Sequence, residues 1–302
     1  IATTIGFSFA QPFILNSPGL VAGKWFPENE RATANSVGLL AGYIGMCVGL
    51  LATPLLMASM SIKGILMFYG LLSVIGALLF LIFAKEQPPT PPCEEEKSER
   101  ASFREGIRYA WKQKNFRLCV LIFFMMLGVF NTFFTDIEAL IQTLGSKAIS
   151  STQVGIIGVI ILIVGTVGSL VLSMMSDKDE LRRRKRYVFG ANILGFVGLL
   201  LMSLFNGFAG MTFAAVLYGF FTVGSAPVLL TMAAESCYPT SEGTSEGLLL
   251  WAGNVAGAVF VGGASLLGGH YTGLYWLLAA CTVIALILIA ATKEIVMGKV
   301  QK

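Results

Sequence analysis

Long apolar runs separated by short polar segments form the main pattern of this sequence. Most runs reach the roughly 20 residues that a helix needs to cross a bilayer, so they predict membrane-spanning helices. The expected fold class is therefore an all-α, polytopic membrane protein. We predict nine spans, at about 3–24, 32–57, 62–84, 118–142, 152–176, 187–205, 210–234, 245–268 and 273–292.

The composition supports the same class. Of the 302 residues, 55% are hydrophobic and 13% are charged, whereas soluble domains carry roughly 25% charged residues. So few charges leave too little polar surface to cover a water-soluble globule of this length. The composition therefore excludes a large soluble domain, a disordered chain and a nucleic-acid-binding module, and we expect no nucleic-acid partner.

Basic residues alternate between the predicted loops. When the loops are assigned in turn to the two membrane sides, 19 of the 21 Lys and Arg residues fall on one side, and only Lys63 and Lys147 on the other. Loops rich in Lys and Arg stay in the cytoplasm. This rule places segment 85–117, the run Arg182–Arg186 and the C-terminus in the cytoplasm, and we expect the basic run to anchor lipid headgroups. The expected location is the cell (plasma) membrane.

Two short segments, Trp25–Thr33 and Cys237–Ser245, share a pattern in which an aromatic residue precedes Pro and a Glu follows it by three positions. They lie 212 residues, or six predicted spans, apart. Parallel six-helix repeats are the construction of major facilitator transporters. We therefore expect residues 1–84 to be three helices of a first half, 85–117 a cytoplasmic linker and 118–302 a complete second half, with three helices missing before the sequence begins.

The predicted linker contains a candidate surface helix. It opens with a Pro-rich, acidic stretch that cannot build a core. Ser102 and Glu105 then have the spacing of a capping box. Phe103, Ile107 and Trp111 follow at helical spacing with basic residues around them. We predict an amphipathic helix that lies on the inner membrane surface.

Motifs for catalysis were not found in the sequence. No phosphate-binding GxxxxGK[ST] loop is present, and the single histidine, His270, falls in a predicted external loop without a second ligand nearby. We expect no enzyme, no cofactor and no metal site. The five cysteines fit no metal motif and are expected to be free thiols in packed positions; they are Cys47, Cys93, Cys119, Cys237 and Cys281.

Polar residues within the spans are candidates for solute contact, because they line cavities or bond to other helices. Gln11 and Asn16 lie beside Pro12 and Pro18, which interrupt a predicted helix. This stretch either lines a cavity or provides hydrogen bonds between helices. Asn131 lies within a later span and has the same two interpretations.

Asp136 and Glu138 are the carboxylates best separated from the predicted cytoplasmic loops. Asp136 follows Arg117 by 19 residues, which corresponds to about 28 Å of helix and places it near the outer surface. The sequence leaves two roles open for Asp136, an interfacial residue and a group for cation attraction or proton coupling.

Pairs of small residues four positions apart recur within the spans, and such pairs let helix backbones approach closely in lipid. They serve either static packing or a sliding surface between helices. The pairs involve Gly38, Gly42, Gly45, Gly49, Gly253 and Gly257.

Several stretches resemble the feline leukaemia virus subgroup C receptor family, namely Phe9–Leu15 with Pro18, Trp25–Phe26, Ser36–Gly38 and Ala234–Leu249. This family belongs to the major facilitator superfamily, whose fold has two six-helix halves. The resemblance implies that the chain carries the fourth to twelfth of twelve helices. It also implies transport of a solute such as choline, ethanolamine or haem, although no predicted span contains the His that haem favours.

The sequence departs from this family at positions that matter for the substrate. Tyr43 and Asn254 stand where its choline-transporting members carry Gln, and Thr135 stands where they carry Tyr. Tyr43 and Trp251 still offer aromatic faces to a cation. Asp177 resembles part of the superfamily's cytoplasmic gating motif, but Ser173 replaces the motif's glycine.

We predict secondary active or facilitative transport of a small organic solute, with organic cations among the candidates, by a monomer that contacts membrane lipids. Two alternatives remain: a truncated or receptor-like membrane protein that does not transport by itself, and a proton-coupled transporter of an unrelated metabolite. The predicted pathway residues are Gln11, Asn16, Tyr43, Asn131, Thr135, Trp251 and Asn254. The predicted gate or coupling residues are Glu30, Asp136, Asp177, Glu235 and Glu242.

Overall fold

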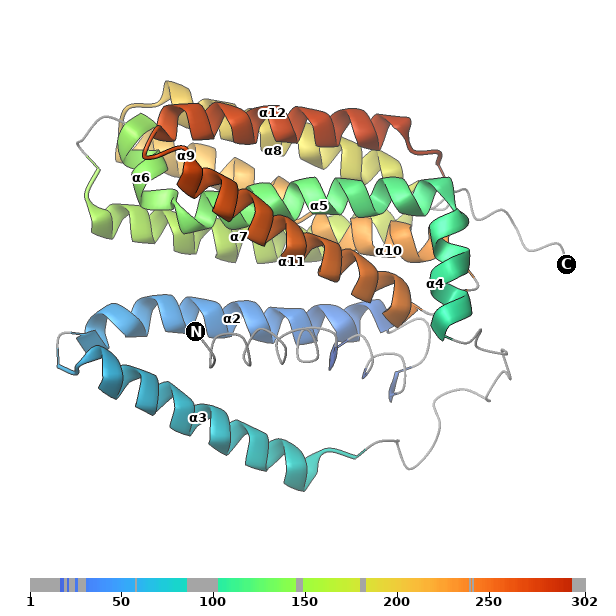
Figure 1. The fold of residues 1–302 in the computed structure, drawn as a ribbon, viewed down its shortest axis with the longest axis horizontal. Helices are drawn as coiled ribbons and strands as arrows, with labels where there is room; N and C mark the ends of the chain where they lie inside the picture. The colour runs from blue at the N-terminus through green and yellow to red at the C-terminus, as the bar shows by residue number, and fades with distance from the viewer. Residues whose placement is uncertain are drawn as a thin grey trace, which may run out of the picture. The chain divides into compact units, whose positions relative to one another are not determined.

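Figure 1 shows the computed structural model of the chain, in which every described element is a helix. The chain divides into two compact units, residues 17–98 and residues 99–302 together with 1–16. For some helical residues, Tyr43 and Glu242 among them, only the backbone is described. The structure describes residues 17–18, 21, 25–26, 31–57, 59–85, 103–144, 149–179, 183–238, 240 and 242–294.

The 17–98 unit holds the helices α2 (Arg31–Met57) and α3 (Ile62–Phe83). Its helices are joined by a polar link, in which the Thr53 hydroxyl donates to the Gly49 carbonyl at 2.6 Å and lies 2.8 Å from the Tyr69 hydroxyl. Because lipid offers no polar partners, hydroxyls within a span bond to the backbone or to a neighbouring helix. Thr53 does both and so connects α2 with α3.

The 99–302 unit is a bundle of long helices that run side by side, with α11 crossing α5 diagonally and α4 lying across the end of α5 (Figure 1). We call this end the basic end. It also carries the connection from α7 to α8 and the end of α12. The elements are α4 (Phe103–Lys112), α5 (Lys114–Thr135), α6 (Ile137–Leu144), α7 (Ser151–Lys178), α8 (Arg184–Leu204), α9 (Phe208–Tyr218), the π-helix η1 (Gly219–Val223), α10 (Ala226–Ser236), α11 (Glu242–Leu266) and α12 (Tyr271–Ala291).

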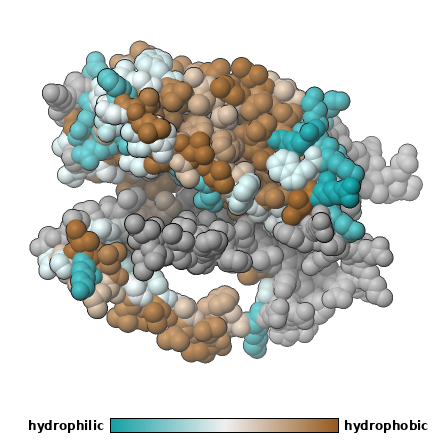
Figure 2. Space-filling model, viewed as in Figure 1, coloured by the Kyte–Doolittle hydropathy of each residue, from teal (hydrophilic) through white to brown (hydrophobic). Residues whose placement is uncertain are grey.

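Seven helices among the described residues are long and apolar enough to cross a membrane. They overlap seven of the nine predicted spans, with ends that differ by at most four residues except at Thr135, where the helix ends before the predicted 142. Helix α2 coincides with the predicted span 32–57, and the predicted span 3–24 lies almost wholly outside the described residues. Figure 2 shows apolar residues over the middle of the 99–302 unit and hydrophilic residues towards its ends, the pattern of a membrane-spanning bundle.

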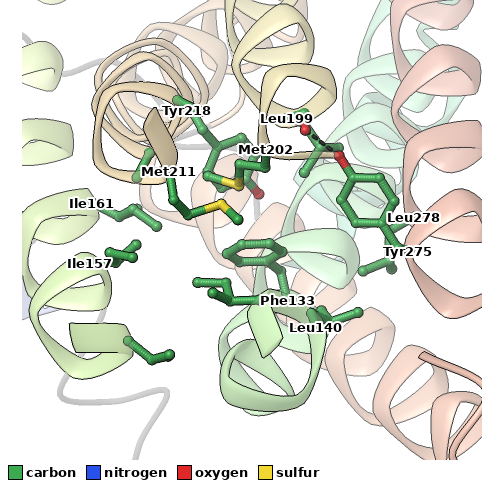
Figure 3. Close-up of a cluster of buried hydrophobic side chains, with 14 of the residues drawn as sticks. Phe133, Leu140, Ile157, Ile161, Leu199, Met202, Met211, Tyr218, Tyr275 and Leu278 are labelled. Carbon is green, nitrogen blue, oxygen red and sulfur yellow. Dashed lines mark hydrogen bonds between the residues drawn. The ribbon is translucent and has the colours of Figure 1, made fainter. Parts of the chain in front are cut away.

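The interior of the 99–302 unit consists of two apolar clusters. One surrounds Phe133, Tyr218 and Tyr275, away from the basic end (Figure 3), and the Tyr275 hydroxyl donates a hydrogen bond to the Leu199 carbonyl. The other surrounds Phe116 and Leu229, near the basic end. These clusters hold helices that are distant in sequence in one packed bundle.

Two predicted spans are not continuous helices. The span predicted at 118–142 is divided at Asp136, which has non-helical backbone angles between α5 and α6. The span predicted at 210–234 contains the π-helix and a short turn before α10. Pro227 is the second residue of α10, a position at which the missing N–H of proline costs nothing.

Glycines permit close helix contacts at some of the predicted small-residue positions. A Cβ on Gly253 of α11 would lie 2.4 Å from a Leu127 methyl of α5, and one on Gly257 would lie 2.6 Å from the Asn131 amide nitrogen. A Cβ on Gly42 or Gly45 of α2 would meet no described atom within 4 Å. Close packing therefore explains Gly253 and Gly257, and also Gly38 of α2, whose Cβ would lie 2.5 Å from the Pro18 Cβ. The role of Gly42, Gly45 and Gly49 stays a prediction.

Candidate functional site

Helix α11 presents two of the predicted pathway residues on its exposed side. Trp251 is 63% exposed, and Asn254 is exposed near the middle of a helix that is long and apolar enough to span the membrane. The Asn254 amide nitrogen donates to the Leu250 carbonyl at 2.9 Å. This bond leaves the amide oxygen without a hydrogen-bond partner among the described residues, so it is available to a ligand, to water or to another helix.

Helix α5 carries the other two described pathway residues, Asn131 and Thr135. The half-buried Asn131 side chain packs against Gly257, three residues beyond Asn254 on α11. Thr135 is exposed, and its hydroxyl donates to the Asn131 carbonyl at 2.7 Å. Close packing at Gly257 therefore places the Asn131 side chain of α5 against α11, about one turn along that helix from Asn254.

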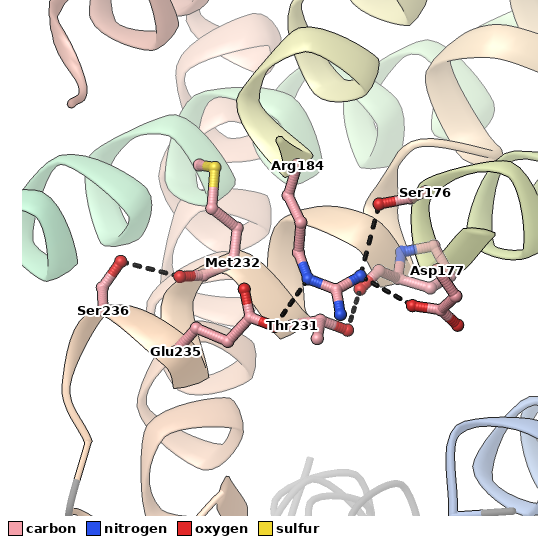
Figure 4. A network of polar contacts seen from close by, with 8 residues as sticks. Ser176, Asp177, Arg184, Thr231, Met232, Glu235 and Ser236 are labelled. Atoms are coloured by element: carbon pink, nitrogen blue, oxygen red, sulfur yellow. Dashed lines mark hydrogen bonds and ion pairs between the residues drawn. The ribbon is translucent and has the colours of Figure 1, made fainter. Parts of the chain in front are cut away.

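A charge network at the basic end joins two of the predicted gate residues (Figure 4). The Arg184 guanidinium donates to Glu235 at 2.8 Å, to Asp177 at 2.9 Å and to the Ser176 hydroxyl at 3.3 Å. Arg184 is 8% exposed as a residue. Two carboxylates therefore surround one buried cation at the junction of α7, α8 and α10.

Burial differs between the two carboxylates of this network. The Glu235 side chain is 11% exposed and the Asp177 side chain 44% exposed. An ion pair that is shielded from water contributes more, and costs more to break, than one that water screens. Glu235 is therefore the stronger electrostatic partner of Arg184, and Asp177 is the partner nearer to solvent.

The basic run that the sequence assigned to lipid headgroups has internal partners instead at three of its positions. Arg184 lies in the charge network, and the Arg183 Nε lies 3.5 Å from an Asp179 carboxylate oxygen. The Lys185 ammonium donates to the carbonyls of Ala290 and Thr292 at the end of α12, at 2.8 and 2.6 Å. Arg186 is exposed, and Arg182 lies outside the described residues.

Sequence reasoning missed Arg184 as the centre of the network, because a residue within a basic run gives no sign of pointing inward. The one available signal was the occurrence of two acidic residues, Asp177 and Glu235, near the same predicted membrane side. A second, buried polar link lies nearer the middle of the spans, where the Asn192 amide donates to the Ser225 hydroxyl at 3.1 Å. That link joins α8 to the turn between η1 and α10.

The remaining predicted site residues do not join these groups in the described part of the chain. Asp136 is half-buried at the division between α5 and α6, where its backbone N–H donates to the Thr132 carbonyl at 3.0 Å. Tyr43 and Glu242 lie on helices, but their side chains are not described. Three further predicted residues lie outside the described residues, namely Gln11, Asn16 and Glu30.

Within the described residues, no group of three or more His, Cys, Asp or Glu side chains could hold a metal ion. The described cysteines are all free, and they range from half-buried to buried. The chemistry of the two residue groups is therefore that of amides, hydroxyls, an indole ring and ion pairs.

Comparison with known proteins identifies the class. The family model of the Major Facilitator Superfamily matches residues 1–261, and the chain belongs to this superfamily. Its fold is the all-helical major facilitator fold, as the sequence predicts. The superfamily comprises membrane transporters and not enzymes, so the chain is an integral multi-pass membrane protein.

Several similar proteins belong to the feline leukaemia virus subgroup C receptor family, which the sequence resembles. The choline/ethanolamine transporter FLVCR1 of Mus musculus is 31% identical over 283 residues, which cover 84% of this chain and 50% of that protein. Solute carrier family 49 member A3 of Danio rerio is 26% identical over 264 residues, 84% of this chain and 54% of that protein. The chain thus spans about half the length of the relatives it matches.

A solved structure supports the fold. The crystal structure of the E. coli fucose:proton symporter matches with a TM-score of 0.65, covering 93% of this chain and 73% of that one. The sequence identity is 12%, so this likeness concerns the fold alone.

Proposed function

We propose that this chain is part of a secondary carrier that moves a small organic solute across a membrane by alternating access. In this proposal residues 1–84 belong to one half of the carrier, 85–117 link the halves, and 118–302 form the other half. The C-terminus is cytoplasmic, and the carrier resides in the plasma membrane as a monomer.

The observation that carries the proposal is the exposed position of Asn254 and Trp251 on α11. A polar amide in contact with lipid near the middle of a span is costly, because hydrocarbon provides no hydrogen-bond partner. Residues of this kind face protein or a water-filled cavity in membrane proteins. The exposed amide therefore supports a solute pathway along this side of α11.

An organic cation is the substrate class that the residues favour. The Trp251 ring is largely exposed, and an indole face attracts a quaternary or primary ammonium group. An amide oxygen at Asn254 accepts a hydrogen bond from a hydroxyl or an ammonium group. The names of the relatives in mouse and other animals give choline and ethanolamine as their solutes, and these are the first compounds to test.

The test is uptake of labelled choline and ethanolamine by proteoliposomes that contain the full-length protein. We expect saturable uptake, and we expect Asn254→Ala and Trp251→Ala each to lower kcat/KM about tenfold, the ratio that a loss of roughly 1.4 kcal/mol produces. The matched control is Val259→Ala, because Val259 is 56% exposed on the same helix but apolar. It should transport normally.

Two outcomes would contradict parts of the proposal. Uptake equal to that of empty liposomes for both compounds and for other organic cations would favour the receptor-like alternative. Uptake that is unchanged in both α11 variants would remove the pathway assignment while leaving transport intact.

Proton coupling is tested by Asp136→Asn in the same assay. Asp136 lies at the end of α5, half-buried, which favours an interfacial role. We expect the pH dependence of uptake to be the same in this variant and in the unmodified protein, and abolition of that dependence would establish the coupled alternative.

A further inference from the structure

Helix α4 is fixed across the basic end of the bundle (Figure 1). The buried Gly106 and Ala110 form its inner face. The Thr240 hydroxyl, from the connection between α10 and α11, donates to the Gly106 carbonyl at 3.3 Å. The Trp111 ring meets the Phe116 ring of α5 edge to face, with 6.3 Å between centroids. Because α4 runs across α5, which spans the bilayer, it lies along the membrane surface.

The outer face of α4 continues into the first turn of α5 as a basic surface. We call the exposed residues Arg108, Lys112, Lys114 and Arg117 the α4 basic surface. No acidic residue occurs between Glu105 and Asp136, and the exposed Glu105, three positions before Arg108, is the one acidic residue of α4. The four cations therefore outnumber it on this surface. Arg108 and Lys112 are one helical turn apart, where like charges repel. Such a surface is stabilised when an external anion is present.

Aromatic residues accompany these charges. Tyr109 is 41% exposed and Trp111 is 42% exposed. Tyr and Trp are enriched at the level of the lipid headgroups, since their rings are apolar and their N–H or O–H groups are polar. The combination of basic and aromatic residues on a surface helix favours anionic lipid over soluble phosphate.

The basic run near the start of α8 presents fewer exposed cations, since Arg186 is the exposed one among its described residues. In the basic run near the start of α8, Arg183, Arg184 and Lys185 all have partners within the protein. The α4 basic surface has four exposed cations in ten residues of sequence. We propose that the α4 basic surface binds the headgroups of anionic phospholipids in the leaflet at the basic end. This proposal does not depend on transport.

Quenching of tryptophan fluorescence by brominated lipid tests the proposal. The full-length protein is reconstituted into vesicles of phosphatidylcholine with the same fraction of either brominated phosphatidylserine or brominated phosphatidylcholine. Comparison with Trp111→Phe isolates the signal of Trp111 from the other three tryptophans. We expect the serine lipid to quench Trp111 more strongly than the choline lipid does, and we expect the excess to shrink in 1 M salt.

Charge removal gives the decisive comparison. Arg108→Gln together with Lys112→Gln should lower the local enrichment of the serine lipid by about fivefold per charge. The matched control is Lys63→Gln, because Lys63 is an exposed lysine at the start of α3 and should leave the Trp111 signal unchanged.

Several results would overturn the proposal. The first is equal quenching of Trp111 by the two lipids, and the second is stronger quenching by the serine lipid that persists in the double variant. The third is loss of this stronger quenching when inorganic phosphate is added at millimolar concentration, which would indicate a site for soluble anions. The circular dichroism of the double variant serves to show that it is folded. Because no step of the assay requires solute movement, failure here is distinct from failure of the transport proposal.

Discussion

At the scale of residues, one buried cation organises the basic end. Arg184 donates to Glu235 and Asp177 from a position that is 8% exposed. A guanidinium suits this position because its donors form a planar fork that serves two carboxylates at once. Its charge cannot be removed by deprotonation near neutral pH, so a buried Arg184 always needs a shielded acceptor, which Glu235 provides.

The first prediction separates the two carboxylates. Glu235→Gln should lower the free energy of unfolding by about 3 kcal/mol, because it leaves a buried cation without its shielded partner. Asp177→Asn should cost under about 1 kcal/mol, since its side chain is 44% exposed and water screens the pair. Unfolding of the detergent-solubilised protein, followed by circular dichroism, measures both. Equal losses of unfolding free energy in the two variants would show that burial does not determine which ion pair is stronger.

The second prediction concerns Cys237, which follows α10. Burial raises the pKa of the Cys237 thiol to about 11. Only the thiolate reacts with maleimides, so at pH 8 this cysteine should react roughly a hundredfold more slowly than an ordinary thiol, and its rate should rise as the pH approaches 11. Labelling followed by peptide mass spectrometry gives the rate. Equal rates in the folded and denatured protein would contradict the burial of this thiol.

At the scale of elements, helix α7 and the π-helix η1 pack at the distance that glycine allows. A Cβ on Gly168 would lie 2.1 Å from the Phe220 carbonyl oxygen, and one on Gly165 would lie 2.7 Å from the Val223 Cβ. A π-helix contains an extra residue and displaces the backbone around it. Small residues on the facing helix accommodate that displacement, and Asn192 supplies a hydrogen bond at the turn that follows.

The third prediction compares two glycines of α7. Gly168→Ala should lower the free energy of unfolding by about 2 kcal/mol, because the obstructing atoms belong to the backbone and cannot rotate away. Gly155→Ala is the matched control, since its Cβ would meet no described atom within 4 Å and alanine favours helix by up to about 1 kcal/mol. Unfolding midpoints rank the pair, and a Gly168→Ala protein as stable as Gly155→Ala would argue against the close contact.

At the scale of the whole molecule, the two ends of the spans differ in charge. Nearly all the basic residues fall on one predicted side, and in the 99–302 unit the structure gathers α4, the start of α5 and the α7–α8 connection at one end (Figure 1). This asymmetry sets the orientation in the membrane. The end that carries His270 should therefore face the cell exterior.

The fourth prediction tests this orientation with single cysteines in a background that lacks the native five. A membrane-impermeant maleimide should label His270→Cys on intact cells, because His270 is exposed just before α12. Lys178→Cys, at the exposed end of α7, should be labelled only after permeabilisation. Labelling of both positions on intact cells would contradict the proposed topology.

Much of the architecture was predictable because it depends on local features of the chain. Hydropathy over 20 residues marks the spans, and the surface helix around Phe103–Lys112 follows from its spacing of apolar residues. The division at Asp136 and the π-helix before Pro227 were harder to predict, since helical periodicity hardly changes there. For the candidate site, the sequence nominated Asp177 and Glu235, but no local signal located Arg184, the cation that joins them.

The sequence by itself determined the class of this protein, its spans and the difference in charge between their ends, because these depend on solvent transfer and on residues a few positions apart. Only the tertiary structure decided how individual polar groups are used. Arg184 points inward because its guanidinium donates to Glu235, 51 residues later in the sequence. Lys185 packs against the protein because its ammonium donates to two carbonyls at the end of α12. Contacts between distant helices select one partner among several that the sequence permits.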